Sequence, residues 1–351
     1  MDEVLRAKHN KYSEVRRKRG IKLIVGIGLC VGAIIIVLNT PMKARLKARL
    51  SLLLNEIEEY TMANENQIPE IEHFKLSTIE VASKGNDMSI VNQYEYVTQR
   101  RRDLFRGNLQ LINGSHACLF REMDQLVDVK ANKNKSYKLM ETNMKLNKDM
   151  VSALNAMMKD FEKATGKHDM ILTSGYRTLA DQGEVLQEKI KLWGEKEALE
   201  WAMLPGYSEH HSGYAVDMSI YTDEGKYVKY KGQDDYAWIN QNCYKYGLIR
   251  RYTEEKKEIT GVSDEQWHYR YIGVPHAYIV TKKNFCLEEY MDYLKQFTFG
   301  STHLVVDCDA GKYEIYFVPS EGRETSVPVP SDKAYTISGN NEDGFIVTVT
   351  L

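Results

Sequence analysis

Two short segments, Ser208–Asp217 and Glu265–His268, contain residue types that bind metals, and a fold in which they form one site must bring them together. A catalytic zinc usually takes three protein ligands from His, Asp or Glu and keeps a fourth position open. His210, Asp217 and His268 supply that number of ligands. The sequence therefore predicts a three-ligand zinc site assembled from two separate segments.

The residues around the first two ligands explain how both can reach one ion. Gly213 lets the backbone turn after His210, and Ala215–Met218 predicts a short buried strand that brings Asp217 back beside that histidine. A carboxylate close to the metal can take a proton during attack and pass it to the leaving amine. We expect Glu265 to be this general base.

Some of these residue types also have common structural roles. Adjacent side chains of an extended segment point to opposite faces, so His211 is not expected to share a metal with His210. Asp217 could be a structural carboxylate in a turn. It follows an apolar strand, however, where an unpaired charge would be costly, and a metal partner is the favoured interpretation.

These segments resemble the motifs of the VanY-type zinc D-alanyl-D-alanine carboxypeptidases, relatives of the VanX-type dipeptidases. Residues 208–217 match the family pattern S-x-H-x-x-G-x-A-x-D at every position. Glu265–His268 matches E-P-W-H, except that Gln266 replaces the proline. Residues 242–252 are similar to the segment Y-G-F-I-L-R-Y, and Arg251 within them has either an active-site role or a structural role at the edge of the core.

A third match concerns substrate recognition. Ser174–Arg177 with Gln182 is similar to the family segment S-G-Y-R-S-Y-x-x-Q. The resemblance implies that Arg177 lies in the active site, where a guanidinium can bind a C-terminal carboxylate or stabilise an oxyanion. A surface ion pair with a nearby acidic residue, Asp181 or Glu184, is the alternative. Gln182 and Ser208 are expected to contact substrate, although hydrogen bonding within the fold would use the same groups.

The resemblance extends over roughly residues 100 to 297 and implies a zinc-dependent enzyme with a defined substrate class. The expected activity is removal of the terminal D-alanine from a peptidoglycan stem peptide or lipid-linked precursor ending in D-Ala-D-Ala. A D,D-dipeptidase and an L,D-carboxypeptidase of the same family are alternatives. A non-catalytic cell-wall binding or sensing protein is a further alternative, but the intact ligands and Glu265 argue against it.

The N-terminal region predicts a membrane anchor. Residues 21–38 form an apolar run interrupted only by Lys22, close to the ~20 residues that cross hydrocarbon as a helix. A basic cluster precedes the run, which favours a cytoplasmic N-terminus, and no small-residue cleavage pattern follows it. We predict a cytoplasmic basic tail at residues 1–20, an uncleaved single-pass anchor in the cell membrane at 21–38, and an extracellular catalytic domain.

The rest of the chain divides by sequence pattern. We expect a stalk or extension at residues 39–99, the zinc carboxypeptidase domain at 100–297 and a small β-rich module at 298–351. The catalytic domain should be α+β, with helices around a small antiparallel sheet that carries the zinc ligands. The patterns predict helices over 147–165 and 185–202 and around Leu287–Leu294, and strands over 170–173, 304–306, 313–318 and 345–351.

Charge and cysteine content restrict the remaining classes. A net charge of −2 argues against a nucleic-acid partner, which normally requires a strong basic excess. The five cysteines show no C-x-x-C spacing and are not expected to bind the zinc. Outside the cell they could pair, and separate buried thiols are an equal alternative. The oligomeric state is not indicated by the sequence.

Overall fold

The computed structural model describes residues 94–119 and 125–351 of the chain. Within these residues, no helix combines the length and the apolar character that crossing a membrane requires. The predicted basic tail, the predicted anchor at 21–38 and most of the predicted stalk lie outside the described residues. The membrane anchor therefore stays a prediction.

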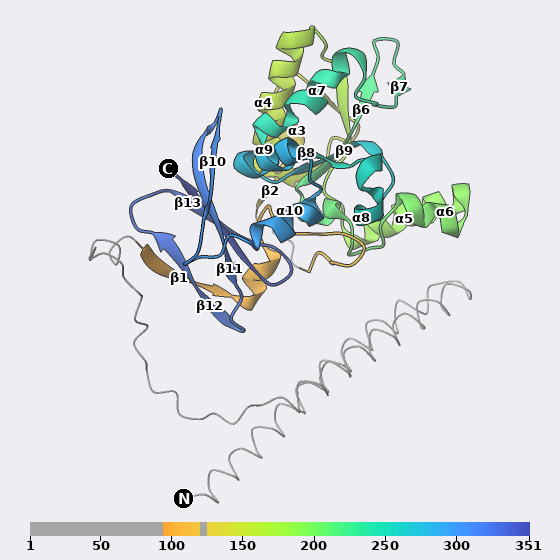
Figure 1. Cartoon of the computed structure of the whole chain (residues 1–351). Helices are drawn as coiled ribbons and strands as arrows, with labels where there is room; N and C mark the ends of the chain where they lie inside the picture. The colour runs from red at the N-terminus through yellow and green to blue at the C-terminus, as the bar shows by residue number, and fades with distance from the viewer. Residues whose placement is uncertain (1–93, 120–124) are drawn as a thin grey trace, which may run out of the picture. The chain divides into compact units, whose positions relative to one another are not determined.

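A mainly antiparallel sheet forms the centre of the catalytic region (Figure 1). Its strands have the order β3-β5-β6-β9-β8, and β7 pairs with β6. Only β3 and β5 pair in parallel; the other pairs are antiparallel. The expected mixture of helices and sheet is confirmed. The strands are β3 (Lys138–Leu139), β5 (Met170–Ser174), β6 (Ala215–Tyr221), β7 (Tyr227–Val228), β8 (Leu248–Tyr252) and β9 (Glu265–Tyr271).

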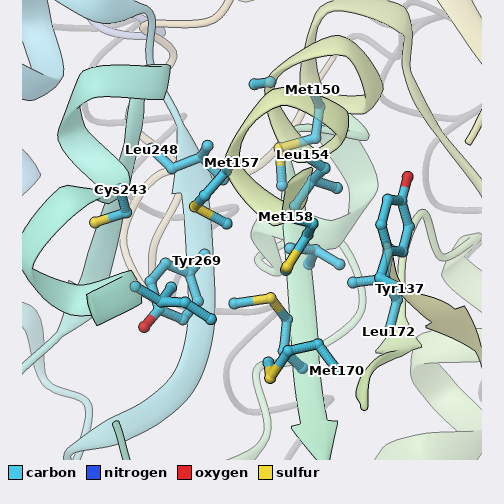
Figure 2. Close-up of a cluster of buried hydrophobic side chains, with 14 of the residues drawn as sticks. Tyr137, Met150, Leu154, Met157, Met158, Met170, Leu172, Cys243, Leu248 and Tyr269 are labelled. Carbon is cyan, nitrogen blue, oxygen red and sulfur yellow. The ribbon is translucent and has the colours of Figure 1, made fainter. Parts of the chain in front are cut away.

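Helix α4 (Lys148–Thr165) covers the core side of this sheet, as its apolar pattern predicts. The Asn147 side chain caps its first turn, and Gly166 ends it in a left-handed conformation at φ 74°. Apolar residues on one side of α4 are buried against the strands, which gives this face of the sheet a dry core. Figure 2 shows Met150, Leu154, Met157 and Met158 of the helix beside Leu172, Leu248 and Tyr269 of the strands.

The predicted helix at 185–202 is two helices, and the first begins earlier than expected. Helix α5 (Leu179–Trp193) starts at a capping box formed by Thr178 and Asp181, and α6 (Glu195–Trp201) follows Gly194, whose φ of 84° interrupts the helical backbone. The remaining α-helices of the described residues are α3 (Val129–Asn132), α7 (Ala237–Asn242), α8 (Lys257–Thr260), α9 (Val274–Lys283) and α10 (Leu287–Leu294).

Further strands form a separate sheet in the order β10-β11-β14-β13, and a ribbon of β1 and β12. Figure 1 shows the orange β1 beside the blue C-terminal strands, although they are far apart in sequence. A two-stranded sheet, β2-β4, completes the strands. Their bounds are β1 (Tyr94–Arg100), β2 (Leu126–Asp128), β4 (Lys145–Asn147), β10 (Leu304–Cys308), β11 (Gly311–Pro319), β12 (Glu324–Pro330), β13 (Tyr335–Gly339) and β14 (Gly344–Thr350).

Strand β11 is buried on both faces. Because successive side chains alternate, Ile315 and Phe317 enter one apolar cluster, while Tyr316 and Val318 enter another. The first cluster also contains α9 and α10 and Ile249 of β8, so the C-terminal strands share a core with the catalytic region. The β-rich module predicted at 298–351 stays a prediction.

The N-terminal side of the chain contributes to the same assembly. Strand β1 falls largely within the predicted stalk, yet it pairs with β12 along its whole length, with Val97 opposite Val327. The expected domain boundaries at residues 99 and 297 remain predictions. Residues on the two sides of each expected boundary pack against one another.

The four cysteines within the described residues are free thiols, and three of them are buried. Of the alternatives left open by the sequence, separate thiols are therefore observed. The four are Cys118, Cys243, Cys286 and Cys308.

Candidate active site

A row of polar side chains crosses three neighbouring strands of the catalytic sheet. Asp217 of β6 lies opposite Ser174 of β5 and opposite His268 of β9. Its neighbours Val216 and Met218 belong to the core packed on α4, and side chains alternate along a strand. Asp217 and His268 are thus cross-strand partners on the face away from that core.

A short turn brings His210 to this row. The 3-10 helix η4 (Glu209–Ser212) ends at Gly213, which has a left-handed φ of 75°. A Cβ at this glycine would lie 2.5 Å from Leu126 Cδ2, so both conformation and space require glycine. The turn places His210 Nε2 3.3 Å from Asp217 Oδ2.

The three predicted ligands converge on one point. The ligand atoms of His210, Asp217 and His268 all lie within 4.8 Å of one another. His210 Nδ1 is 2.7 Å from the Gly175 carbonyl, to which it can only donate, so Nε2 keeps its lone pair toward Asp217. His268 Nδ1 lies 2.9 Å from Asp217 Oδ1. Two imidazoles and one carboxylate in this arrangement fit a zinc ion.

The two histidines of the ligand set have different electrostatic surroundings. Burial and the positive charge of Arg177 lower the pKa of His210 to about 4. For His268, burial acts in the opposite direction to the hydrogen bonds with Asp217 and Glu209, and those bonds prevail and raise its pKa to about 9. The carboxylates around His268 therefore stabilise positive charge at this position.

Glu265 has the properties of a general base. Burial raises its pKa to about 7, although the charge of His268 opposes this shift. A carboxyl group with a pKa near neutrality can both accept and release a proton. The neighbouring Asp264 is used otherwise, since it lies 3.6 Å from Arg250 and accepts a hydrogen bond from Gln266, the residue that replaces the family proline.

Arg177 lies in the site, and all three of its donor groups have partners. Its ion-pair partner is Asp217, not the expected structural alternatives Asp181 and Glu184. This ion pair holds the Arg177 guanidinium beside Asp217, which is one of the predicted metal ligands. The contacts are Nε to Ser174 Oγ (2.8 Å), Nη1 to Gln182 Oε1 (3.0 Å) and Nη2 to Asp217 Oδ2 (2.8 Å).

The two residues expected to contact substrate differ in their surroundings. Gln182 is buried, and its amide is used at both ends, because it accepts from Arg177 and donates to the Met203 carbonyl at 2.8 Å. This arrangement positions Arg177. Ser208 is buried at the start of η4, where its side chain makes no capping hydrogen bond. Substrate contact by either residue stays a prediction.

The structure places His211 outside the ligand set. Its Nε2 accepts a hydrogen bond from the Gly206 amide at 2.9 Å, and its Nδ1 lies 2.8 Å from the Arg177 carbonyl. Both ring nitrogens therefore stabilise the loops around the site.

A buried charge cluster, formed by Glu209, Arg251, Arg270 and Glu288, lies behind His268. Arg251 is buried between Glu209 and Glu288, so the structure gives it a structural position in this cluster. No sequence signal marked Glu209 or Arg270 as residues of the site. Glu209 occupies an unspecified position of the motif, and its burial depends on arginines that are remote in sequence.

Lys189 of α5 is another residue near the site that was not predicted from the sequence. Its Nζ donates to the Trp201 carbonyl at 2.6 Å, and Trp201 stacks on Trp267 with ring centroids 6.2 Å apart. The positive charge of Lys189 acts on the carboxylates of Glu265 and Asp217. A lysine on a helix carries no signal of this kind in the sequence.

Known proteins resemble this chain in both sequence and structure. A family model described as VanY: D-alanyl-D-alanine carboxypeptidase matches residues 143–274, which include every residue predicted for the site. A D-alanyl-D-alanine carboxypeptidase of Enterococcus faecium is 36% identical over 255 residues, covering 72% of this chain and 78% of that protein.

Two further relatives connect the chain to dipeptidases. The bifunctional D-Ala-D-Ala dipeptidase and carboxypeptidase VanXYC of Enterococcus gallinarum is 39% identical over 138 residues, 38% of this chain and 73% of that protein. The crystal structure of the vancomycin-resistance D,D-dipeptidase VanXYg, in complex with a D-Ala-D-Ala phosphinate analog, matches with a TM-score of 0.66 and 27% identity, covering 74% of this chain and 99% of that one. The chain belongs to the VanY family of D-alanyl-D-alanine carboxypeptidases.

Proposed function

We propose that this protein is a membrane-anchored zinc carboxypeptidase that removes the terminal D-alanine from peptidoglycan stem peptides or lipid-linked precursors ending in D-Ala-D-Ala. One observation carries the proposal. The ligand atoms of His210, Asp217 and His268 converge within 4.8 Å of one another, and Glu265 lies close enough for the charges of His268 and Asp217 to act on it.

The residues around the ligands have complementary tasks. A zinc ion held by the three ligands would supply Lewis-acid polarisation of the scissile carbonyl. Glu265 removes a proton from the attacking water and delivers it to the leaving amine, which is the exchange that peptide hydrolysis requires. Its half-buried position partly shields the carboxylate from bulk water.

Arg177 supplies fixed positive charge. Its contacts with Ser174, Gln182 and Asp217 hold the guanidinium in one place at the site. A preorganised cation stabilises negative charge without having to reorganise during the reaction, either on the developing oxyanion or on the C-terminal carboxylate of the peptide. This property suits an enzyme that cleaves the last residue.

Carboxypeptidase and dipeptidase activities are separated by the products. The zinc-loaded protein should release D-alanine from a pentapeptide ending in D-Ala-D-Ala, identified by mass spectrometry, and Glu265→Gln serves as the inactive control. Faster cleavage of free D-Ala-D-Ala would favour a dipeptidase, as the VanXYg relative is named. Cleavage only of a tetrapeptide at an L,D bond would favour an L,D-carboxypeptidase, and no cleavage of any of them would contradict the enzyme.

The proposed location depends on the apolar run at residues 21–38 and the basic residues before it. Protease added to intact cells should digest a tag placed at Leu351 and leave the first twenty residues protected. Protection of the C-terminal tag, in cells whose surface proteins are digested, would reverse the orientation and remove access to the cell wall.

A further inference from the structure

The hydrogen bonds around His268 assign a task to a residue outside the ligand set. We infer that Glu209 is a positioning residue: its carboxylate fixes the ring and the proton of His268 so that Nδ1 faces the metal. This inference rests on the proposed zinc function and deepens it. Glu209 itself contacts neither substrate nor the reacting atoms.

The two rings use opposite nitrogens. The Nδ1–H of His210 donates a hydrogen bond to the Gly175 carbonyl, which leaves the Nε2 lone pair for the metal. At His268 the arrangement is reversed, because Nε2 lies 3.1 Å from Glu209 Oε2 while Nδ1 lies 2.9 Å from Asp217 Oδ1. A carboxylate only accepts, so in this structure both ring nitrogens of His268 donate, Nε2 to Glu209 and Nδ1 to Asp217. Zinc binding would displace the Nδ1 proton at the point where the ligand atoms converge, while Glu209 would retain the proton on Nε2.

Glu209 is itself fixed by two guanidinium groups. Its Oε1 accepts from Arg251 Nε at 2.9 Å and from Arg270 Nη1 at 2.8 Å, and its side chain is fully buried. These contacts occupy Oε1, so Oε2 remains for His268. A charge buried this completely requires such partners.

The cluster behind Glu209 is balanced in charge. Arg251 also makes two contacts with Glu288 of α10, at 2.9 and 2.7 Å, so two carboxylates face two guanidinium groups. Glu288 accepts as well from Asn113 at 3.0 Å and, among the described residues, makes no hydrogen bond to His268. It therefore provides a matched control for the loss of one negative charge.

Zinc affinity separates positioning from support of the fold. Zinc alone, titrated in competition with a chelator, should bind Glu209→Gln about 10- to 100-fold more weakly than the wild type. The amide can offer a donor to Nε2, which favours the wrong tautomer of His268. Glu288→Gln should lose thermal stability as well, yet keep zinc affinity within about threefold, because it does not touch the ring. Equal weakening in both variants, or wild-type affinity in Glu209→Gln, would overturn the inference.

A measurement on the wild type covers the case in which Glu209→Gln fails to fold. Nitrogen NMR of the zinc-loaded protein labelled with ¹⁵N-histidine should show His268 protonated on Nε2 and His210 protonated on Nδ1. A proton on Nδ1 of His268 would overturn the inference while the carboxypeptidase assay still supports the proposed function. Wild-type protein that binds no zinc would instead overturn both.

Discussion

The catalytic sheet and the C-terminal sheet use cross-strand pairs for different purposes. In the catalytic sheet, Asp217 and His268 stand opposite each other on β6 and β9, and the same face of β9 continues into the buried ion pair of Arg270 with Glu209. In the C-terminal sheet, Phe317 of β11 stands opposite Ile346 of β14, and both enter an apolar cluster. The same antiparallel geometry thus carries a reactive site in one sheet and only packing in the other.

This difference indicates which property a substitution in each sheet should change. Apolar packing is non-directional, so a cavity in the C-terminal sheet lowers stability without changing which atoms meet. The polar row of the catalytic sheet depends on direction, because each ring nitrogen and carboxylate oxygen faces specific partner atoms. Substitutions in the two sheets should therefore affect different measurements.

The largest effect is expected for the ligands. Changing His210, Asp217 or His268 to alanine should abolish zinc binding and activity together, because each removes one of three ligands. Metal content by atomic emission and turnover of a D-Ala-D-Ala peptide check this. His211→Ala is the control and should keep its zinc, since both ring nitrogens of His211 face backbone groups. A ligand variant with full metal content would refute the assignment.

Glu265→Gln should come next. Loss of the general base is expected to lower kcat by roughly 10² to 10⁴. Zinc content should stay at the wild-type level, because Glu265 is not a ligand. The matched control is Asp264→Asn, since Asp264 pairs with Arg250 instead. If Asp264→Asn proves the slower variant, the base has been assigned to the wrong carboxylate.

In the C-terminal sheet, Ile315→Ala should lower stability and spare the chemistry. Deleting this buried side chain is expected to cost about 2–5 kcal/mol of unfolding free energy. Zinc affinity and kcat, measured well below the melting temperature, should not change. Val305→Ala, at an exposed position of β10, should cost no more than about 0.5 kcal/mol. A large drop in zinc affinity for Ile315→Ala would break the contrast between the sheets.

The smallest effect is expected for Lys189→Met. The Lys189 ammonium lowers the pKa of Glu265, so its removal should raise that pKa. Because the base acts in its deprotonated form, the acidic limb of the kcat/KM profile should move to higher pH. Lys191→Met, at an exposed position of the same helix, should leave the limb in place. A shift toward lower pH would show that Lys189 acts in another way.

Local patterns in the sequence predicted local structure well. The apolar period of residues 147–165 predicted α4, and the apolar run at 170–173 predicted β5. The early start of α5 had a visible signal as well, because Thr178 and Asp181 have the spacing of a capping box. For the site, the motifs identified residues that the structure brings together. What the motifs did not predict is the set of residues that contact those site residues.

What the sequence could not predict depends on long-range pairing. Strand β12 contains Pro328 and Pro330, which argue against a central strand. These prolines are tolerated because, among the described residues, β12 pairs with β1 alone. In the sequence, Glu209 has the character of an ordinary surface residue. Its burial becomes evident only because the fold brings Arg251 and Arg270 beside it. The spacing of apolar residues within one segment cannot indicate either of these arrangements.

The two-sided burial of β11 has a consequence for how this enzyme can be divided. One face of the strand needs segments that follow the catalytic motifs, and the other needs the β1-β12 ribbon, of which β1 precedes them. A fragment limited to residues 143–274 would carry every ligand but leave Ile249 and its apolar neighbours open to water. The segment that carries the motifs is therefore not an independent folding unit. Grafting it onto another protein would also require the segments before and after it.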